Sequence, residues 1–143
     1  MYKFNNILLV DDDPSTSRFH QIVIDRLEIT QKISFAKNGR DALDYLLSTG
    51  DYKSNSDEFV QPEIIIIDLN MPVMNGFRFI ELYTETENFK QYNPKIIVLS
   101  TSLIPEEKEK IEENRNIYKF LNKPLTKDSI SNLLNEVVLD VNI

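Results

Sequence analysis

The chain has 143 residues, about the size of one domain, and 41% of them are hydrophobic, which is enough for a buried core. Its formal net charge of −7 argues against direct nucleic-acid binding, which requires a basic surface, and no apolar run reaches the length of a membrane span. The absence of cysteine excludes disulfides and zinc–thiolate sites, and the N-terminus lacks a signal-peptide pattern, so we expect a cytoplasmic protein.

The first part of the chain predicts two strand–helix units. Residues 7–10 form an apolar strand, and Asp13-Pro14 is typical of a helix N-cap followed by proline at the first helical position. Residues 33–36 form a short second strand, and a second helix begins after Asn38-Gly39. The apolar residues assigned to the two helices are Phe19, Ile22, Val23 and Leu27, and then Ala42, Leu43, Leu46 and Leu47.

The connection from Ser48 to Gln61 is the one oversized link in this pattern, and it is rich in Ser, Asn, Asp and Gly. Connections of this length are usually functional or mobile. We interpret this one as a disordered surface insertion.

Three more strand–helix units follow. Four isoleucines, Ile64 to Ile67, form a short β-branched run typical of a strand buried on both faces of a parallel sheet. Residues 96–99 and 117–121 form two further strands. The helices that follow these strands carry Phe77, Ile80 and Tyr83, then Ile111 alone, and finally Ile130, Leu133, Leu134, Val137 and Val138. Five such units predict a doubly wound α/β fold, a parallel sheet with helices on both faces, whose strand order the periodicity does not reveal.

Charged and hydroxyl side chains follow the strands at their carboxyl ends. Asp11, Asp12 and Asp13 follow the first strand, and Asp68, Ser100 and Lys123 end the third, fourth and fifth. These ends meet at one edge of a parallel sheet, where α/β folds bind ligands. Clustered carboxylates repel one another, so the cluster predicts a hard divalent cation beside a nucleophilic aspartate. Such a carboxylate can form an acyl phosphate, and the cation, a lysine and a hydroxyl can neutralise the phosphoryl oxygens.

Each residue also has a plainer interpretation. Asp13 before Pro14 is better read as a helix cap than as a metal ligand. Taken singly, Ser100 is an ordinary strand-end hydroxyl, Phe120 a core residue and Lys123-Pro124 a turn. His20, the one histidine, is expected on the exposed side of its helix.

Four motifs in this order resemble the receiver domain of bacterial two-component response regulators, the CheY-like family. They are Leu8-Leu9-Val10-Asp11-Asp12-Asp13-Pro14, Asp68-Leu69-Asn70-Met71-Pro72-Val73-Met74-Asn75-Gly76, Val98-Leu99-Ser100-Thr101-Ser102 and Phe120-Leu121-Asn122-Lys123-Pro124. The resemblance implies a five-stranded parallel sheet of order 2-1-3-4-5. It covers nearly the whole chain, so we expect residues 1–143 to form a single, stand-alone receiver domain with no output domain.

The resemblance also implies roles for individual residues. Asp68 is the expected phosphoacceptor, and the expected ligands of Mg²⁺ or Mn²⁺ are Asp11, Asp12, Asp68 and the backbone carbonyl of Asn70. Asp12 would bind the metal directly and Asp11 more often through water. Ser100 and Phe120 are the expected switch residues, and Lys123 would pair with the phosphoryl group and precede a cis bond to Pro124.

The expected partners are a sensor histidine kinase or a histidine phosphotransfer protein, together with an unknown protein target. A homodimer through the helix from Pro105, the strand 117–121 and the last helix is also possible. Neither nucleic acid nor a membrane is expected as a partner. The last helix continues with Leu139, Val141 and Ile143, which either form such an interface or fold back on the first helix.

Three other functions remain open. A degenerate receiver would act only as a binding scaffold. An aspartate-nucleophile phosphohydrolase resembles a family that needs a second aspartate two residues after the nucleophile, and Asn70 stands there. A flavodoxin-type redox protein needs a phosphate loop after the first strand, where Asp11 to Asp13 would repel the FMN phosphate. We therefore expect a signalling phosphoacceptor, whose own chemistry is limited to self-phosphorylation from small donors and self-dephosphorylation, rather than an enzyme.

Overall fold

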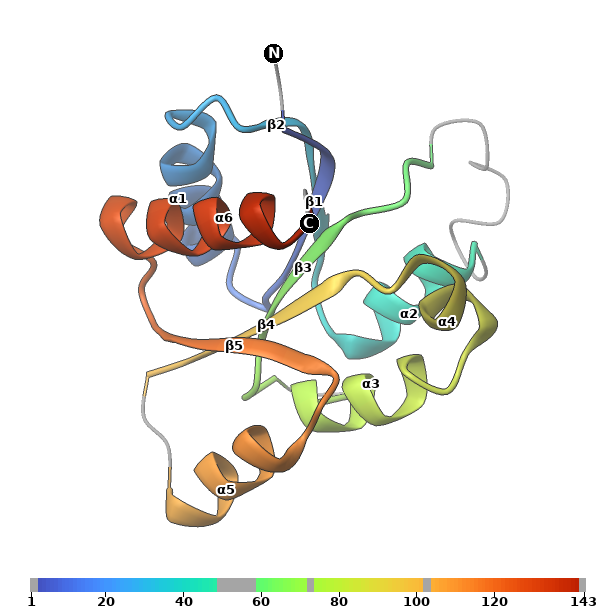
Figure 1. The fold of residues 1–143 in the computed structure, drawn as a ribbon. Helices are drawn as coiled ribbons and strands as arrows, with labels where there is room; N and C mark the ends of the chain where they lie inside the picture. The colour runs from blue at the N-terminus through green and yellow to red at the C-terminus, as the bar shows by residue number, and fades with distance from the viewer. Residues whose placement is uncertain (1–2, 49–58, 72–73, 102–103, 142–143) are drawn as a thin grey trace.

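A computed structural model describes residues 3–48, 59–71, 74–101 and 104–141 of the chain, without the side chains of residues 140 and 141. Its centre is a five-stranded parallel sheet of order β2-β1-β3-β4-β5, which confirms the predicted fold class and strand order (Figure 1). The strands are β1 Phe4–Val10, β2 Thr30–Ala36, β3 Ile64–Asp68, β4 Lys95–Ser100 and β5 Ile117–Asn122.

The isoleucine strand β3 lies in the middle of this sheet. All of its residues are buried, and Ile66 is paired with Leu9 of β1 on one side and with Ile97 of β4 on the other. A strand that is covered on both faces needs apolar side chains at every position, and the isoleucine run supplies them. Because the pairing is parallel and in step, the strands on either side of β3 end at the same edge of the sheet.

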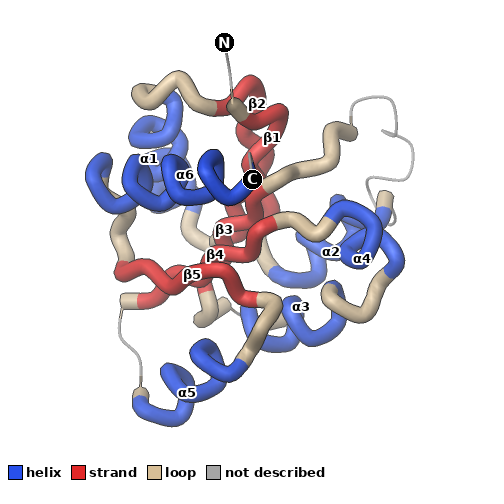
Figure 2. Tube along the Cα trace, viewed as in Figure 1, coloured by secondary structure: helices blue, strands red, loops and turns tan. Residues whose placement is uncertain are grey.

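Helices cover both faces of the sheet (Figures 1 and 2). The helices α1 Pro14–Asp25 and α6 Lys127–Val141 pack on one face, against a core that includes Ile7, Leu9 and Ile66. The helices on the other face are α2 Gly39–Leu47, α3 Gly76–Tyr83, α4 Glu87–Tyr92 and α5 Pro105–Glu113. Successive strand residues point to opposite faces, so Leu8 and Ile65 belong to this second core.

The sequence did not predict α4. It is a short helix whose buried side chain is Phe89, and the hydroxyl of Thr86 caps its first turn by accepting the Phe89 N–H at 3.2 Å. Such a helix contains fewer than two turns, so it has too few apolar residues to produce a helical period.

The inner face of α1 also differs from the prediction. Of the four apolar residues assigned to this helix, Val23 and Leu27 pack against the core, but Phe19 and Ile22 are 46% and 36% exposed. The stripe that packs inward is Ser17, His20 and Ile24. Two of these three residues are polar, so hydrophobic spacing does not reveal the most buried part of the helix.

Most of the long connection from Ser48 to Gln61 lies outside the described residues. Its last residues are tied to the sheet and to α4. The Val60 carbonyl accepts a bond from the buried amide of Asn6 on β1 at 2.7 Å, and Gln61 Oε1 accepts one from Asn88 on α4 at 3.1 Å. Asn6 also donates to the hydroxyl of Tyr45 at 3.0 Å. These bonds hold the chain in place as it enters β3.

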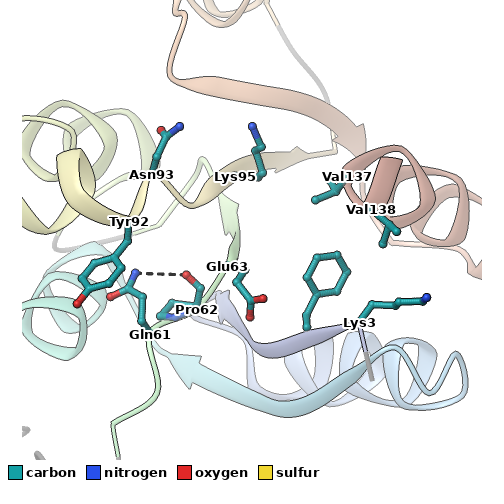
Figure 3. Close-up of a pocket in the computed structure, with 10 residues that line it drawn as sticks. Lys3, Gln61, Pro62, Glu63, Tyr92, Asn93, Lys95, Val137 and Val138 are labelled. Atoms are coloured by element: carbon teal, nitrogen blue, oxygen red, sulfur yellow. Dashed lines mark hydrogen bonds between the residues drawn. The ribbon is translucent and has the colours of Figure 1, made fainter. Parts of the chain in front are cut away.

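A cavity of about 370 Å³ lies at the end of the sheet where the parallel strands begin (Figure 3). Phe4, Glu63 and Lys95 line it from the sheet, and Val137 and Val138 line it from α6. None of the site residues predicted from the sequence lines this cavity. It is therefore separate from the opposite edge, where the acidic residues stand.

Candidate functional site

The structure brings three carboxylates together at the carboxyl edge of the sheet. Val10 is paired with Ile67, so Asp11 follows β1 beside the end of β3, where Asp68 stands. Asp11 and Asp68 are each only 6% exposed, whereas Asp12 is open to solvent. One oxygen from each of the three carboxylates lies within 4.8 Å of the others. The cluster expected from the sequence is therefore present.

Lys123 enters this cluster from the end of β5. Its Nζ lies 3.0 Å from Asp68 Oδ2, to which it donates a hydrogen bond, and 2.7 Å from Asp11 Oδ2. Burial lowers the pKa of Lys123, but the close contacts and charges of Asp11 and Asp68 outweigh it and leave the pKa above its ordinary value. The lysine is therefore a charged ammonium between two buried carboxylates.

The remaining carboxylate oxygens show how the two buried acids are held. Asp11 Oδ1 accepts the Asp13 N–H at 2.9 Å, and Asp68 Oδ1 accepts the Asn70 N–H at 3.2 Å. The second oxygen of Asp11, the buried Oδ2, lies 2.7 Å from the Lys123 ammonium, and the two form an ion pair.

The cluster fits a hard divalent cation. One ammonium balances only part of the charge of three carboxylates, and Asp11 Oδ2 retains capacity as an acceptor. Carboxylate oxygens are the ligands that Mg²⁺ and Mn²⁺ prefer. The donor set Asp11, Asp12 and Asp68 therefore suits either ion. Asn70 is exposed beside this set and uses its N–H on Asp68.

Gly76 allows the loop after β3 to fold tightly beside Asp68. A Cβ atom at this position would lie 2.9 Å from both the Asp68 carbonyl oxygen and Leu69 Cα, distances that real Cβ contacts essentially never show. The Gly76 N–H instead bonds to the Leu69 carbonyl at 3.0 Å. Glycine is therefore needed for close approach at this position, which is the first residue of α3.

The two expected switch residues occupy different places. Ser100 is fully buried at the end of β4, and its carbonyl accepts the Lys123 N–H at 3.0 Å. Phe120 is half-buried on β5, where it is paired with Val98 and lines a hollow with Ile111 of α5. Ser100 is thus tied to the backbone of the lysine, whereas Phe120 faces α5.

Two local predictions are confirmed. Asp13 caps α1, because its carboxylate accepts the Ser15 N–H at 3.1 Å and the Thr16 hydroxyl at 2.7 Å. The bond from the Thr16 hydroxyl, followed by the bond from the Ser15 N–H, lowers the pKa of Asp13. The peptide bond between Lys123 and Pro124 is cis.

The prediction for His20 is wrong. The side chain was expected to be exposed, but it is only 2% exposed, and its Nε2 accepts the Leu125 N–H at 3.2 Å. Burial lowers the pKa of His20, Lys123 lowers it further, and Asp11 partly opposes this. Ser17, His20 and Ile24 are spaced three and four residues apart, as residues on one face of a helix are. Because two of them are polar, this spacing does not appear as a hydrophobic pattern in the sequence.

Comparison with known proteins identifies the family. Residues 7–135 match the sequence model described as the response regulator receiver domain. The chain belongs to this family. The receiver is 26% identical over 132 residues to the probable methanogenesis regulatory protein FilR2 of Methanothrix harundinacea, a match that spans 92% of this chain and 79% of that protein.

Solved structures give the same result. A two-component response regulator from Cytophaga hutchinsonii matches with a TM-score of 0.80 and 28% identity, over 96% of this chain and 98% of the other. Response regulator Rcp1 of Synechocystis is 28% identical over 96 residues, which are 67% of this chain and 61% of that protein. A Mn²⁺-bound structure of Rcp1 shares the fold at a TM-score of 0.74 and 24% identity, over 92% and 90% of the two chains.

Receiver domains are typically phosphoacceptors that interact with histidine kinases, and the acid cluster of this receiver is consistent with phosphorylation of an aspartate. In the part of the chain that the structure describes, no helix has both the length and the apolar character needed to cross a membrane.

The acid cluster predicts how two neighbouring substitutions differ in Mg²⁺ binding. Asp12→Ala removes a carboxylate of the cluster, so its affinity for Mg²⁺ should fall. Asp13→Ala removes the cap of α1, so it should lower the free energy of unfolding while changing Mg²⁺ affinity less. Calorimetric titration with Mg²⁺ and urea unfolding of both variants measure the two effects.

Asp13→Ser is the matched control, because serine can still cap the helix. It should recover most of the stability lost in Asp13→Ala. Equal losses of Mg²⁺ affinity in the alanine variants of Asp12 and Asp13 would contradict the assignment of ligands.

Proposed function

We propose that this receiver accepts a phosphoryl group on Asp68 from a sensor histidine kinase or a histidine phosphotransfer protein, with Mg²⁺ or Mn²⁺ bound, and signals through protein contacts. The observation that carries the proposal is the position of Asp68. Its carboxylate is buried at the carboxyl end of the central strand, its Oδ2 contacts the Lys123 ammonium, and it shares a cluster with Asp11 and Asp12.

The chemical step is a transfer between two nucleophiles. A carboxylate oxygen of Asp68 attacks phosphorus, the bond from phosphorus to the donor imidazole nitrogen breaks, and that nitrogen keeps the electron pair. Lys123 would leave the carboxylates for an oxygen of the transferred group. The ammonium is positioned for this, because it already lies 3.0 Å from Asp68 Oδ2.

The cation would be held by Asp11, Asp12, Asp68 and the backbone carbonyl of Asn70. When bound, it would neutralise charge on the carboxylates and on the incoming phosphoryl oxygens. The oxygen-only donor set supports Mg²⁺ or Mn²⁺, and the Mn²⁺-bound form of Rcp1 shows a related fold with the latter.

The structure favours a phosphoacceptor over a phosphohydrolase. A hydrolase of this type needs an acid two residues after the nucleophile to move a proton. Asn70 stands there, and an amide cannot serve as an acid or base at neutral pH. The scaffold alternative requires an incomplete site, whereas Asp11, Asp12, Asp68 and Lys123 are together here.

The donor protein has to cover the acid cluster, since its phosphohistidine must reach Asp68. A hollow of about 370 Å³ lies beside Asp11 and Asp12, lined by Arg18 of α1 and by Phe35 of β2, whose ring is partly exposed. This combination of an apolar ring and a cation next to the acids supports docking of the donor at this place.

The output surface is proposed to be α5, β5 and α6, as a homodimer or as a contact with a target. Leu139 of α6 is 66% exposed, which supports an interface rather than packing on the first helix. Lys119 and Glu136 form an ion pair at 3.2 Å between β5 and α6 and mark the polar part of this surface. The other apolar side chains expected there, Val141 and Ile143, lie outside the described side chains.

Ser100 and Phe120 are proposed to carry the signal to α5. Ser100 would move toward the phosphoryl group and Phe120 would repack against Ile111. The helix suits this role because Ile111 is its buried residue and the others are mostly charged, so little apolar burial holds it.

Hydrogen exchange with and without Mg²⁺ and beryllofluoride should therefore change protection between Ser100 and Phe120. The Asp68→Ala variant under the same conditions is the control and should show no change. Changes in protection elsewhere, with none in this segment, would refute the proposed switch.

The phosphoacceptor itself is tested by incubation with acetyl phosphate and Mg²⁺, read by intact mass and peptide mapping. We expect one phosphoryl adduct on Asp68 and none in Asp68→Ala, because Asp68 is the acid held by Lys123 at the end of the central strand. Lys123→Ala is a second comparison and should be modified more slowly. Full modification of Asp68→Ala would show that another residue is the acceptor.

A further inference from the structure

The segment that carries Lys123 into the acid cluster is fastened at two points. Lys123-Pro124-Leu125 contains two backbone N–H groups, because proline has none. The Lys123 N–H bonds to the Ser100 carbonyl of β4 at 3.0 Å. The Leu125 N–H bonds to the ring nitrogen Nε2 of His20 on α1 at 3.2 Å. One anchor is thus backbone from the neighbouring strand, and the other is a side chain from a different layer.

The second anchor has no evident backbone substitute. Leu125 is fully buried and lies before the start of α6 at Lys127. Its N–H therefore takes no part in the hydrogen bonds within that helix. Buried backbone donors are almost always satisfied, and the His20 ring performs that task here. The two partners are 105 residues apart in the chain, and both are shielded from water.

The position of His20 on α1 links this anchor to the acids. Asp11 and Asp12 immediately precede α1, and Asp13 caps it. The His20–Leu125 bond therefore fixes the segment after Lys123 to the element that follows Asp11. The two contacts of the lysine, 2.7 Å to Asp11 and 3.0 Å to Asp68, depend on that relative placement.

We propose that His20 is a positioning residue that holds the Lys123 ammonium over Asp68 through the backbone N–H of Leu125. The ring acts as an acceptor, so its proton resides on Nδ1. The proposal rests on the proposed function, since Lys123 is the group that would receive the phosphoryl oxygens.

Two substitutions of His20 separate positioning from packing. His20→Leu fills the space without an acceptor, and His20→Gln keeps an acceptor oxygen at about the reach of Nε2. The probe is beryllofluoride with saturating Mg²⁺, followed by ¹⁹F NMR, because the chain has no tryptophan to report binding.

His20→Leu should weaken beryllofluoride binding roughly tenfold, which is the loss expected for a residue that orients a binding group without touching the ligand itself. The affinity for Mg²⁺ should stay unchanged. His20→Gln should bind beryllofluoride like the unaltered protein. In a Lys123→Ala background, His20→Leu should cause no further loss, because the group it positions is gone.

Three results would each overturn the proposal: unchanged beryllofluoride affinity in His20→Leu, equal loss of Mg²⁺ and beryllofluoride affinity, or failure of His20→Gln to differ from His20→Leu. A receiver with native His20 that does not bind beryllofluoride at Asp68 would instead refute the proposed function.

A measurement on the unaltered chain does not depend on how the variants fold. The chain has one histidine, so its ¹⁵N signals need no assignment by mutation. At pH 8 we expect an unprotonated Nε2 and a proton on Nδ1. A proton on Nε2 would exclude the bond from Leu125 and overturn the proposal.

Discussion

Two buried carboxylates that share one ammonium are the interaction on which the rest of the site depends. Asp11 and Asp68 are almost fully enclosed, and Lys123 stands between them at 2.7 and 3.0 Å. Two like charges at 4 Å repel by about 4 kcal/mol near a protein surface, so the pair requires a positive partner. The lysine meets part of that need and leaves the cluster able to attract a divalent cation.

The fold produces this arrangement by simple means. Parallel strands that are paired in step end at one edge, and the two central strands each deliver an acid there. The lysine arrives from the edge strand β5 and is fastened by bonds to Ser100 and, through Leu125, to His20. The ends of the four strands β1, β3, β4 and β5 therefore meet at this site, together with the His20 side chain of α1.

The sequence predicted those parts of the molecule that depend on local pattern. The isoleucine run identified the central strand, Asp13-Pro14 identified the cap of α1, and the acids at the strand ends identified the cluster. Strand order came only from family resemblance, because pairing partners leave no trace in the periodicity of a single strand.

The remaining features depend on tertiary contacts that the sequence pattern does not encode. The inner face of α1 carries Ser17 and His20, and the burial of the His20 ring is offset by its bond with the Leu125 N–H. The partner of His20 is a backbone N–H 105 residues away, which no spacing rule can identify. The short helix α4 is held by Phe89 and its cap rather than by an apolar stripe.

We propose that Lys123 is a mobile counter-charge, which contacts the carboxylates before phosphorylation and the phosphoryl group afterwards. A crystal structure with Mg²⁺ and beryllofluoride tests this most directly. We predict that Lys123 Nζ leaves Asp11 Oδ2, now 2.7 Å away, and contacts a fluorine atom on Asp68 while the cation is bound to Asp11. A beryllofluoride adduct on Asp68 with Lys123 still paired to Asp11 would contradict it.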